Sequence, residues 1–189
     1  MVTAAVLPGS ATAQKSPAEI RKMLQARDLE IKTILGDRDT FSAGQKETLK
    51  SVVNGIIDFE TMGREALGPH WEPLTTEQRG RFVEVFSDIV RSQSLSNLDV
   101  YRAPVTYDEI TVADDRARVI TSTVYKDVPA RVTYEMLYRQ NGWFIADIIL
   151  DDVSTTGGYS RSFQSVIRKK GFDALMTSLE KRRARDKTS

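Results

Sequence analysis

Residues that could carry catalytic chemistry are few in this chain. It contains no cysteine and a single histidine, His70, which lies in the turn-rich aromatic stretch "LGPHW". Thiol catalysis and disulfide bonds are therefore excluded, and a zinc site would need several carboxylates, which is an uncommon ligand set. A Ser-His-Asp triad would have to use His70, yet the chain has no G-x-S-x-G motif. We expect His70 to have a packing or surface role.

Two acidic pairs and one glycine pair are the remaining candidates for binding a small ion. Asp114-Asp115 and Asp151-Asp152 each follow a strand-like segment. Either pair could bind a cation, but Asp is favoured in turns for its local hydrogen bonds, so solvated turns are predicted. Gly157-Gly158 before a helix could offer backbone N–H groups to an anion, but the chain lacks both common phosphate-binding glycine motifs. The polar residues thus predict no enzyme, no metal site and no cofactor.

Composition favours an ordinary globular domain without a nucleic-acid partner. The chain has 189 residues, 40% of them hydrophobic and 28% charged. Lys and Arg number 27 against 26 Asp and Glu, and this balance gives no electrostatic reason to bind nucleic acid. A chain of this size buries roughly 70% of the surface that it exposes when unfolded. We predict one domain over residues 14–182, followed by a frayed basic tail over 183–189.

The N-terminal segment is typical of the end of an export signal. "MVTAAVLPGSATAQKS" has a short apolar run, a Pro-Gly-Ser break and then Ala11-Thr12-Ala13. A helix breaker followed by small residues at these positions is characteristic of a signal-peptidase site. Residues 1–13 are therefore predicted to be the remnant of an export signal, and the mature protein is predicted to be soluble.

Apolar residues at helical spacing predict helices at both ends of the chain. Ser16, Ser42, Asp58 and Thr75 are predicted to cap four helices, which end near Gly36, 57, Gly68 and 98. After the strand-like region, a helical pattern runs from Tyr159 and stops at Gly171, and a last one begins at Phe172 and carries Leu175, Met176 and Leu179. The fourth helix, from Thr75, has the strongest apolar stripe.

Between residues 105 and 150 the apolar period changes from helical to alternating. Four segments with this pattern, 105–112, 116–125, 130–139 and 143–150, are joined by short links such as Asn141-Gly142. Short links predict an antiparallel meander. The fold class is thus α+β, with about six helices packed on a four-stranded curved sheet.

The last of these strands is apolar on both faces. Alternation places Trp143, Ile145 and Ile149 on one face, and Phe144, Ala146, Ile148 and Leu150 on the other. Both faces of this strand must therefore be covered, and we expect a helix to cover one of them. Asp147 falls on the face of Trp143 and Ile145, where it would be buried.

Two long stretches of the chain resemble the MlaC family, the toluene-tolerance auxiliary proteins of Gram-negative ABC lipid-transport systems. The stretches are "DFETMGREALGPHWEPLTTEQRGRFVEVFSDIV" (58–90) and "GWFIADIILDDVSTTGGYSRSFQSVIRKKGFDALMTSLEKR" (142–182). They supply the family's pattern residues Asp58, Phe59, Leu67, Gly68, Trp71, Leu74, Thr75, Glu77, Gln78, Phe82, Phe86, Gly142, Trp143, Ile145, Asp147, Ile148, Leu150, Val153, Ser154, Tyr159, Arg161, Phe163, Gly171 and Leu175. The chain departs from the family at Asp152, where glycine is usual, and at residues 155–158.

The resemblance implies a periplasmic carrier that holds a phospholipid by its acyl tails. It implies a nuclear-transport-factor-like cone with an internal apolar pocket, so that a lipid-accessible core would meet the second face of the strand 143–150. It also implies a monomer that exchanges lipid with an outer-membrane lipoprotein complex and with an inner-membrane ABC permease bearing an MCE-domain protein, touching membranes transiently through these partners. The departures near residue 152 put the identity of the cargo in question more than the fold.

Candidate lipid-binding residues are those expected to face inward from each layer. They are Val85, Phe86 and Ile89 from the fourth helix, Tyr134, Met136, Ile145 and Ile148 from the sheet, and Phe163 and Ile167 from the penultimate helix. The alternative for each of them is a core residue that contacts only other side chains. Arg161 is a candidate for the lipid headgroup, and a salt bridge with Asp147 or Asp152 is the alternative.

Three functions remain open from the sequence. The first is the phospholipid carrier, with a hopanoid or another polycyclic or isoprenoid lipid as alternative cargo. The second is a small-molecule enzyme on the same cone fold, with Asp147 or Tyr134 as the candidate acid or base. The third is an adaptor that binds the permease and has a filled core.

Overall fold

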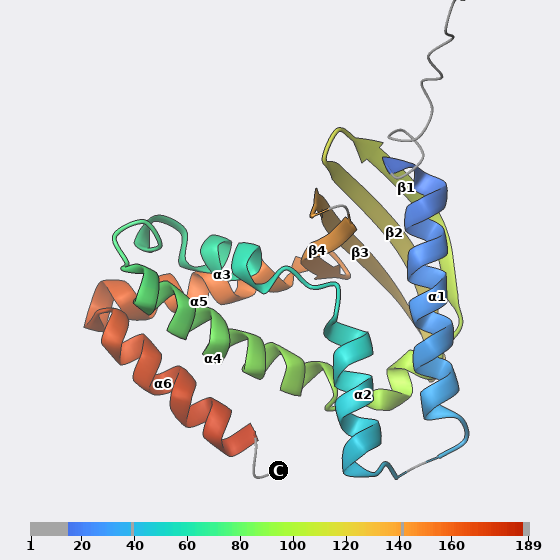
Figure 1. The fold of residues 1–189 in the computed structure, drawn as a ribbon, viewed down its shortest axis with the longest axis horizontal. Coiled ribbons are helices and arrows are strands. Elements are labelled where there is room, and N and C mark those ends of the chain that lie inside the picture. Colours follow the sequence, from blue (N-terminus) through green and yellow to red (C-terminus); the bar gives the residue numbers. More distant parts are fainter. Residues whose placement is uncertain (1–14, 39, 141, 187–189) are drawn as a thin grey trace, which may run out of the picture.

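The computed structural model describes residues 15–38, 40–140 and 142–186 (Figure 1). The predicted export-signal remnant at residues 1–13 lies outside this range. The helices and strands follow in the order α1 (Pro17–Leu35), α2 (Ala43–Asn54), α3 (Phe59–Leu67), η2 (Gly68–His70), α4 (Thr76–Ser94), η3 (Leu98–Arg102), β1 (Val105–Ala113), β2 (Arg116–Tyr125), β3 (Val128–Arg139), β4 (Gly142–Leu150), β5 (Val153–Ser154), α5 (Thr155–Lys170) and α6 (Phe172–Asp186). The predicted α+β class, with six α-helices and an antiparallel sheet, is confirmed for the described residues. The cone shape remains a prediction.

The helices begin at the predicted capping residues. The Ser16 hydroxyl accepts a hydrogen bond from the Glu19 N–H (3.2 Å), and the pairs Ser42/Gln45 and Thr75/Gln78 form complete capping boxes. α1 ends at Gly36, whose φ of 46° favours glycine. Two helices end earlier than predicted, α2 at Asn54 instead of 57 and α4 at Ser94 instead of 98. The last helix continues through residues 183–186, which the sequence had placed in the frayed tail.

Bonding to the sheet explains why α2 ends early. The Ile145 N–H donates to the Ile56 carbonyl (2.6 Å), and the Asp58 N–H donates to the Ile145 carbonyl (2.8 Å). These bonds place Ile57 beside Ile145 in a parallel bridge, after a turn at residues 55–56. The bridge covers this part of the β4 edge, where another chain could otherwise pair.

The sheet has five strands in the order β1-β2-β3-β4-β5, one more than predicted. The additional strand, β5, is only two residues long, too short to show an alternating pattern. It pairs with the end of β4 across a tight turn at Asp151-Asp152, where both residues have positive φ (45° and 66°). The Asp151 carboxylate also accepts the Arg131 N–H (2.9 Å). Turns at this pair and at Asp114-Asp115, as predicted, are confirmed.

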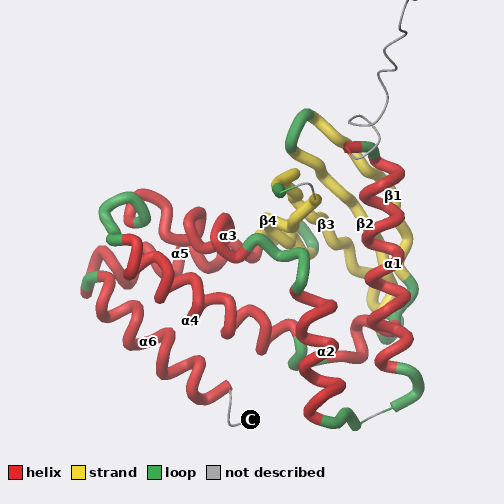
Figure 2. Tube along the Cα trace, in the orientation of Figure 1, coloured by secondary structure: helices red, strands yellow, loops and turns green. Residues whose placement is uncertain are grey.

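The molecule divides into a sheet half and a helical half. Figure 2 shows α1 crossing one face of the sheet, with α3, α4, α5 and α6 grouped to one side and α2 between the two halves. We call the face covered by α1 the inner face. In the helical half, α3 and α4 approach closely at Gly63, where a Cβ would lie 3.0 Å from the Phe82 ring.

The buried apolar residues form three clusters. The helical cluster joins α3, α4, α5 and α6 and includes Met62, Phe82, Phe86, Phe163 and Leu175. The sheet cluster joins α1 to the inner face and includes Ile20, Leu24, Val119, Met136, Trp143 and Ile145. The α1–α2 cluster contains Ile31, Leu35, Leu49 and Val52, with Leu95, Leu98 and Tyr101 packed against it. Compact domains usually have one contiguous core. This fold differs from them in having its buried apolar residues divided among three clusters.

A β-bulge corrects the predicted alternation in β4. Asp147 pairs with Glu135 and Ile145 with Met136, so Ala146 is an extra residue in the strand. Residues after the bulge change faces. Ile148, and not Ile149, therefore lies on the inner face with Trp143 and Ile145, and Asp147 points to the opposite face.

Candidate functional site

The nine predicted lipid-binding residues lie in two separate clusters. Val85, Phe86, Ile89, Phe163 and Ile167 belong to the helical cluster or pack against it. Tyr134, Met136, Ile145 and Ile148 belong to the sheet cluster or pack against it. Ile57, just after α2, contacts both clusters. The structure therefore brings together the four residues of the sheet, and separately the five residues of the two helices.

Aromatic packing fills the centre of the helical cluster. Phe82 and Phe86 stack with their ring centroids 5.6 Å apart, and Phe163 meets both rings edge-on at 5.9 and 6.0 Å. Tyr159 packs edge-on against Phe86 at 5.0 Å. Phe82 and Phe86 are completely buried, as expected for side chains that contact each other.

The inner face of the sheet is more open. Tyr134 lies between Val119 on β2 and Ile148 on β4, and burial raises the pKa of its phenol. Nevertheless, Tyr134, Ile148 and Val132 are only half-buried, although α1 covers this face. These three side chains therefore keep part of their surface accessible, unlike Met136 and Ile145 beside them.

Three phenols surround this part of the interior, and none can act as a base near neutral pH. Burial raises the pKa of Tyr101 to about 12 and that of Tyr107 to about 12, and the pKa of Tyr134 is raised for the same reason. The Tyr101 hydroxyl donates to the Ser94 carbonyl (2.9 Å). The phenols therefore stay protonated, and that of Tyr101 is already hydrogen-bonded.

Asp147, the other candidate for acid–base chemistry, accepts three local hydrogen bonds. Its carboxylate accepts hydrogen bonds from the Ile148 N–H (2.9 Å), the Thr156 N–H (2.9 Å) and the Ser154 hydroxyl (2.5 Å). These bonds tie the end of β4 to β5 and to the first turn of α5. A carboxylate closed by three local donors fits a structural role better than a catalytic one.

The structure leaves the other polar candidates apart from one another. His70 is half-buried in η2, and Arg161 is exposed on α5. Among the described residues, no ion pair joins Arg161 to Asp147 or Asp152. Within the same residues, no group of three or more His, Cys, Asp and Glu side chains could hold a metal ion.

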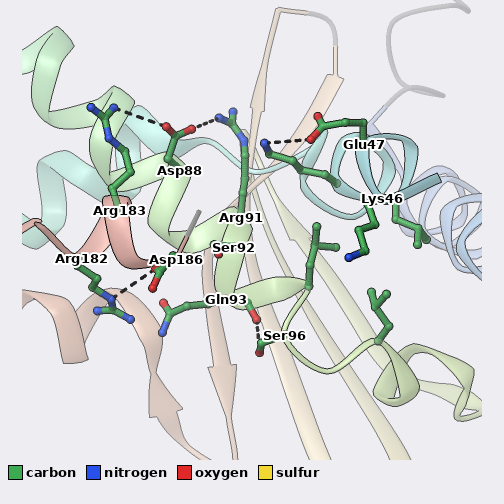
Figure 3. A pocket seen from close by; sticks show the side chains of 14 residues that line it. Lys46, Glu47, Asp88, Arg91, Ser92, Gln93, Ser96, Arg182, Arg183 and Asp186 are labelled. Atoms are coloured by element: carbon green, nitrogen blue, oxygen red, sulfur yellow. Dashed lines mark hydrogen bonds and ion pairs between the residues drawn. The ribbon is translucent and has the colours of Figure 1, made fainter. Parts of the chain in front are cut away.

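A large open pocket lies between three helices: α2, α6 and the C-terminal part of α4 (Figure 3). This pocket was not predicted from the sequence. Its volume is ≈ 780 Å³, and we call it the basic groove. It is lined by Lys46, Glu47, Leu49, Lys50, Asp88, Arg91, Ser92, Gln93, Leu95, Ser96, Leu98, Arg182, Arg183 and Asp186. These residues come from three distant parts of the chain. Only one local feature of the sequence indicates the groove: Lys46 and Lys50 lie four residues apart on one face of α2.

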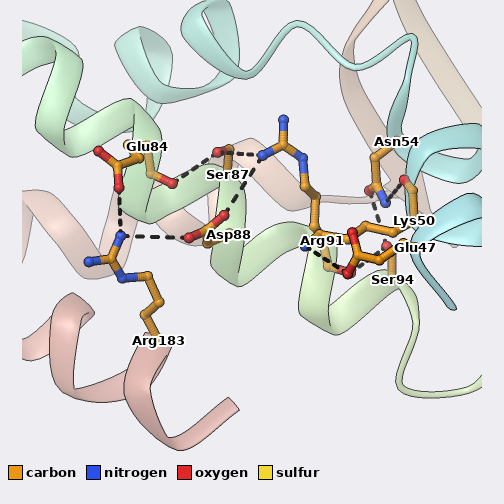
Figure 4. Close-up of polar contacts among 9 residues, drawn as sticks. All are labelled: Glu47, Lys50, Asn54, Glu84, Ser87, Asp88, Arg91, Ser94 and Arg183. Atoms are coloured by element: carbon orange, nitrogen blue, oxygen red, sulfur yellow. Dashed lines mark hydrogen bonds and ion pairs between the residues drawn. The ribbon is translucent and has the colours of Figure 1, made fainter. Parts of the chain in front are cut away.

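Ion pairs form one wall of the basic groove (Figure 4). Arg183 of α6 contacts Glu84 (3.0 Å) and Asp88 (3.6 Å) of α4, and Asp88 also faces Arg91 (3.8 Å). On the α2 side, the Ser94 hydroxyl donates to the Asn54 side-chain oxygen (3.0 Å). These contacts hold the C-terminal end of α4 against α6 on one side and α2 on the other.

No helix in the described part of the chain combines the length and apolar character needed to cross a membrane.

Comparison with known proteins gives matches over most of the chain. The family model described as MlaC protein matches residues 28–181. The "Intermembrane phospholipid transport system binding protein MlaC" of Haemophilus influenzae is 19% identical over 190 residues, which cover 95% of this chain and 88% of that protein. A solved structure, the phospholipid-binding protein from Ralstonia solanacearum in complex with a phospholipid, superposes with a TM-score of 0.74 at 20% identity. That match covers 94% of this chain and 99% of the other.

Proposed function

The chain belongs to the MlaC family, and from that premise we propose that it is a periplasmic carrier of glycerophospholipid. The observation that carries the proposal is the family match over residues 28–181. The Ralstonia solanacearum relative, which shares the fold, was solved with a phospholipid bound.

We infer that the acyl tails lie between α1 and the inner face of the sheet. The half-buried side chains there, Tyr134, Ile148 and Val132, support this placement, as does the division of the core into three clusters. Of the nine residues predicted from the sequence, Tyr134, Met136, Ile145 and Ile148 then line the lipid chamber. The five residues of α4 and α5 stay a prediction, which the replacement of Phe86 described in the Discussion tests.

The energetics of hydrocarbon transfer suit a shuttle. Each buried methylene contributes about 0.8 kcal/mol against water, so two sixteen-carbon tails with about 30 methylenes gain roughly 24 kcal/mol. Relative to a bilayer the gain is near zero, because the tails are already in hydrocarbon. A protein of this kind can therefore load and unload, and the direction of transport comes from its partners.

The partners that we propose are those of the family. The carrier exchanges lipid, as a monomer, with an outer-membrane lipoprotein complex and with an inner-membrane ABC permease that bears an MCE-domain protein. Transient docking on these complexes would supply the direction that the carrier itself lacks.

Native mass spectrometry of the protein purified from its own host, followed by lipid extraction, tests the proposed function. We expect a mass increase of about one phospholipid per molecule, because a filled chamber is far more stable than one exposing apolar walls to water. If a polycyclic or isoprenoid lipid co-purifies, the protein is still a lipid carrier, but its ligand is not a glycerophospholipid. If the protein carries no lipid and turns over a soluble polar substrate, the proposed carrier function is refuted.

A further inference from the structure

The basic groove carries more positive than negative charge. Five basic side chains line it, Lys46, Lys50, Arg91, Arg182 and Arg183, against three acidic ones, Glu47, Asp88 and Asp186. The acidic groups are shared, since Asp88 contacts both Arg91 (3.8 Å) and Arg183 (3.6 Å). Glu84, outside the lining, also pairs with Arg183 (3.0 Å), so that an excess of one positive charge remains. A net positive charge in a concave site attracts anions.

The positions of Lys46 and Lys50 are unfavourable for α2 itself. They are four residues apart on one face of the helix, where like charges repel. Lys46 also lies near the helix N-terminus, where the helix dipole disfavours a cation. Among the described residues Lys46 has no ion-pair partner, and Lys50 has only the exposed Glu47, at 3.7 Å. Helix electrostatics therefore does not account for these two lysines.

Arg91 faces them from α4 and is held in a fixed position. Its guanidinium lies over the Phe59 ring (4.5 Å to the centroid) and donates to the Ser87 hydroxyl (3.0 Å). Arg91 and Lys50 also line a smaller adjoining pocket of ≈ 270 Å³. An arginine fixed in this way loses little conformational entropy when it binds an anion.

Leucines make part of the groove apolar. Leu49, Leu95 and Leu98 line it, and all three belong to the α1–α2 cluster or pack against it. A ligand that is anionic at one end and apolar beyond it matches both parts of this lining. Figure 3 shows the charged side chains around the groove, which come from α2, α4 and α6.

We propose that the basic groove binds the phosphate group of an amphipathic ligand, with Lys46, Lys50 and Arg91 around the phosphate and the three leucines against its apolar part. The assignment rests on the proposed function, because a phospholipid headgroup is the ligand of this chemistry that such a carrier would meet. Free phosphate shares the same chemistry and is the other source of the anion.

The test compares two single-chain lipids of equal chain length, lysophosphatidylglycerol and a monoacylglycerol that has no phosphate. The double variant Lys46→Gln, Lys50→Gln is expected to bind lysophosphatidylglycerol about tenfold more weakly than the wild type, the loss typical of a charged hydrogen bond. Its affinity for the monoacylglycerol stays unchanged. An excess of inorganic phosphate that competes with lysophosphatidylglycerol in the wild type assigns the site to phosphate in general, and a lack of competition assigns it to the lipid headgroup.

A matched control removes the same charge elsewhere. Lys22 and Lys181 are exposed and lie outside the groove, so Lys22→Gln, Lys181→Gln should bind both lipids as the wild type does. The groove variant should unfold at the same temperature as the wild type or higher, because the repulsion between Lys46 and Lys50 is removed. Wild-type affinity in the groove variant, or an equal loss in the control, would overturn the phosphate site alone. Wild-type protein that binds neither lipid would overturn the proposed function itself.

Discussion

Replacing Ile148 with tryptophan is expected to lower the affinity for a lysophospholipid about tenfold. Ile148 is half-buried on the inner face, paired with Tyr134. A larger indole would displace about two methylenes of an acyl tail, each worth about 0.8 kcal/mol against water, and 1.4 kcal/mol corresponds to a factor of ten. The free energy of unfolding should change by less than about 1 kcal/mol, because Ile148 is only partly buried and the ring would enter the proposed chamber. Titration of the lysophospholipid and urea denaturation measure the two effects.

The neighbouring residue provides the control for this experiment. Ile149 is also half-buried, but it pairs with Thr133 and Ser154 and points to the other face of the sheet. Ile149→Trp should therefore bind lipid like the wild type. If Ile148→Trp instead binds lipid normally and loses the 1–3 kcal/mol typical of an overpacked core, the space beneath α1 is filled by side chains and the lipid chamber lies elsewhere.

Replacing Phe86 with alanine is expected to lower the free energy of unfolding by about 3–5 kcal/mol, the usual loss for a buried aromatic residue. Phe86 is completely buried and contacts three other rings, those of Phe82, Tyr159 and Phe163. Lipid affinity, measured under conditions where the variant stays folded, should remain within about twofold of the wild type if the chamber lies under α1, because the ring contacts of Phe86 are all within the helical cluster.

A graded variant separates packing from lipid contact. Phe86→Leu keeps an apolar side chain and should recover part of the lost stability, again with wild-type lipid affinity. A loss of lipid affinity in folded Phe86→Ala that is as large as the loss in Ile148→Trp would show that α4 lines the chamber, as the sequence pattern had indicated for Val85, Phe86 and Ile89.

Local rules predicted the elements of the fold well. The capping residues Ser16, Ser42 and Thr75 specified where helices begin, and the limits of β2 agreed with the predicted 116–125. These features depend on hydrogen bonds and side-chain periods within a few residues. The end of α2 was not predictable in this way, because it depends on bonds from residues 56–58 to Ile145, which is distant in the chain.

The placement of the candidate residues in the fold was less predictable, for the same physical reason. The extra residue at Ala146 changed the face of every later residue in β4, and no local pattern announced it. The division of the nine candidates between two clusters follows from the way in which the two halves pack. The basic groove depends on α2, α4 and α6 meeting in space, so that only the spacing of Lys46 and Lys50 could have indicated it.

The two halves of the molecule have different roles in this account. The helical half is held by stacked rings and by ion pairs such as that between Arg81 and Glu180 (2.6 Å), and gives a stable support. The sheet half, with α1 over its inner face, provides the walls that meet the lipid. Asp147 connects them by tying β4 to the start of α5.

Photo-crosslinking with a phospholipid that carries a diazirine at the end of one acyl tail tests most directly where the hydrocarbon is held. The lipid is loaded into the wild-type protein and irradiated, and the labelled peptides are identified by mass spectrometry. We expect labels within residues 132–138 and 143–148 of the sheet and on the facing side of α1. Labels confined to residues 82–90 of α4 and 159–167 of α5, with none on the sheet, would contradict it.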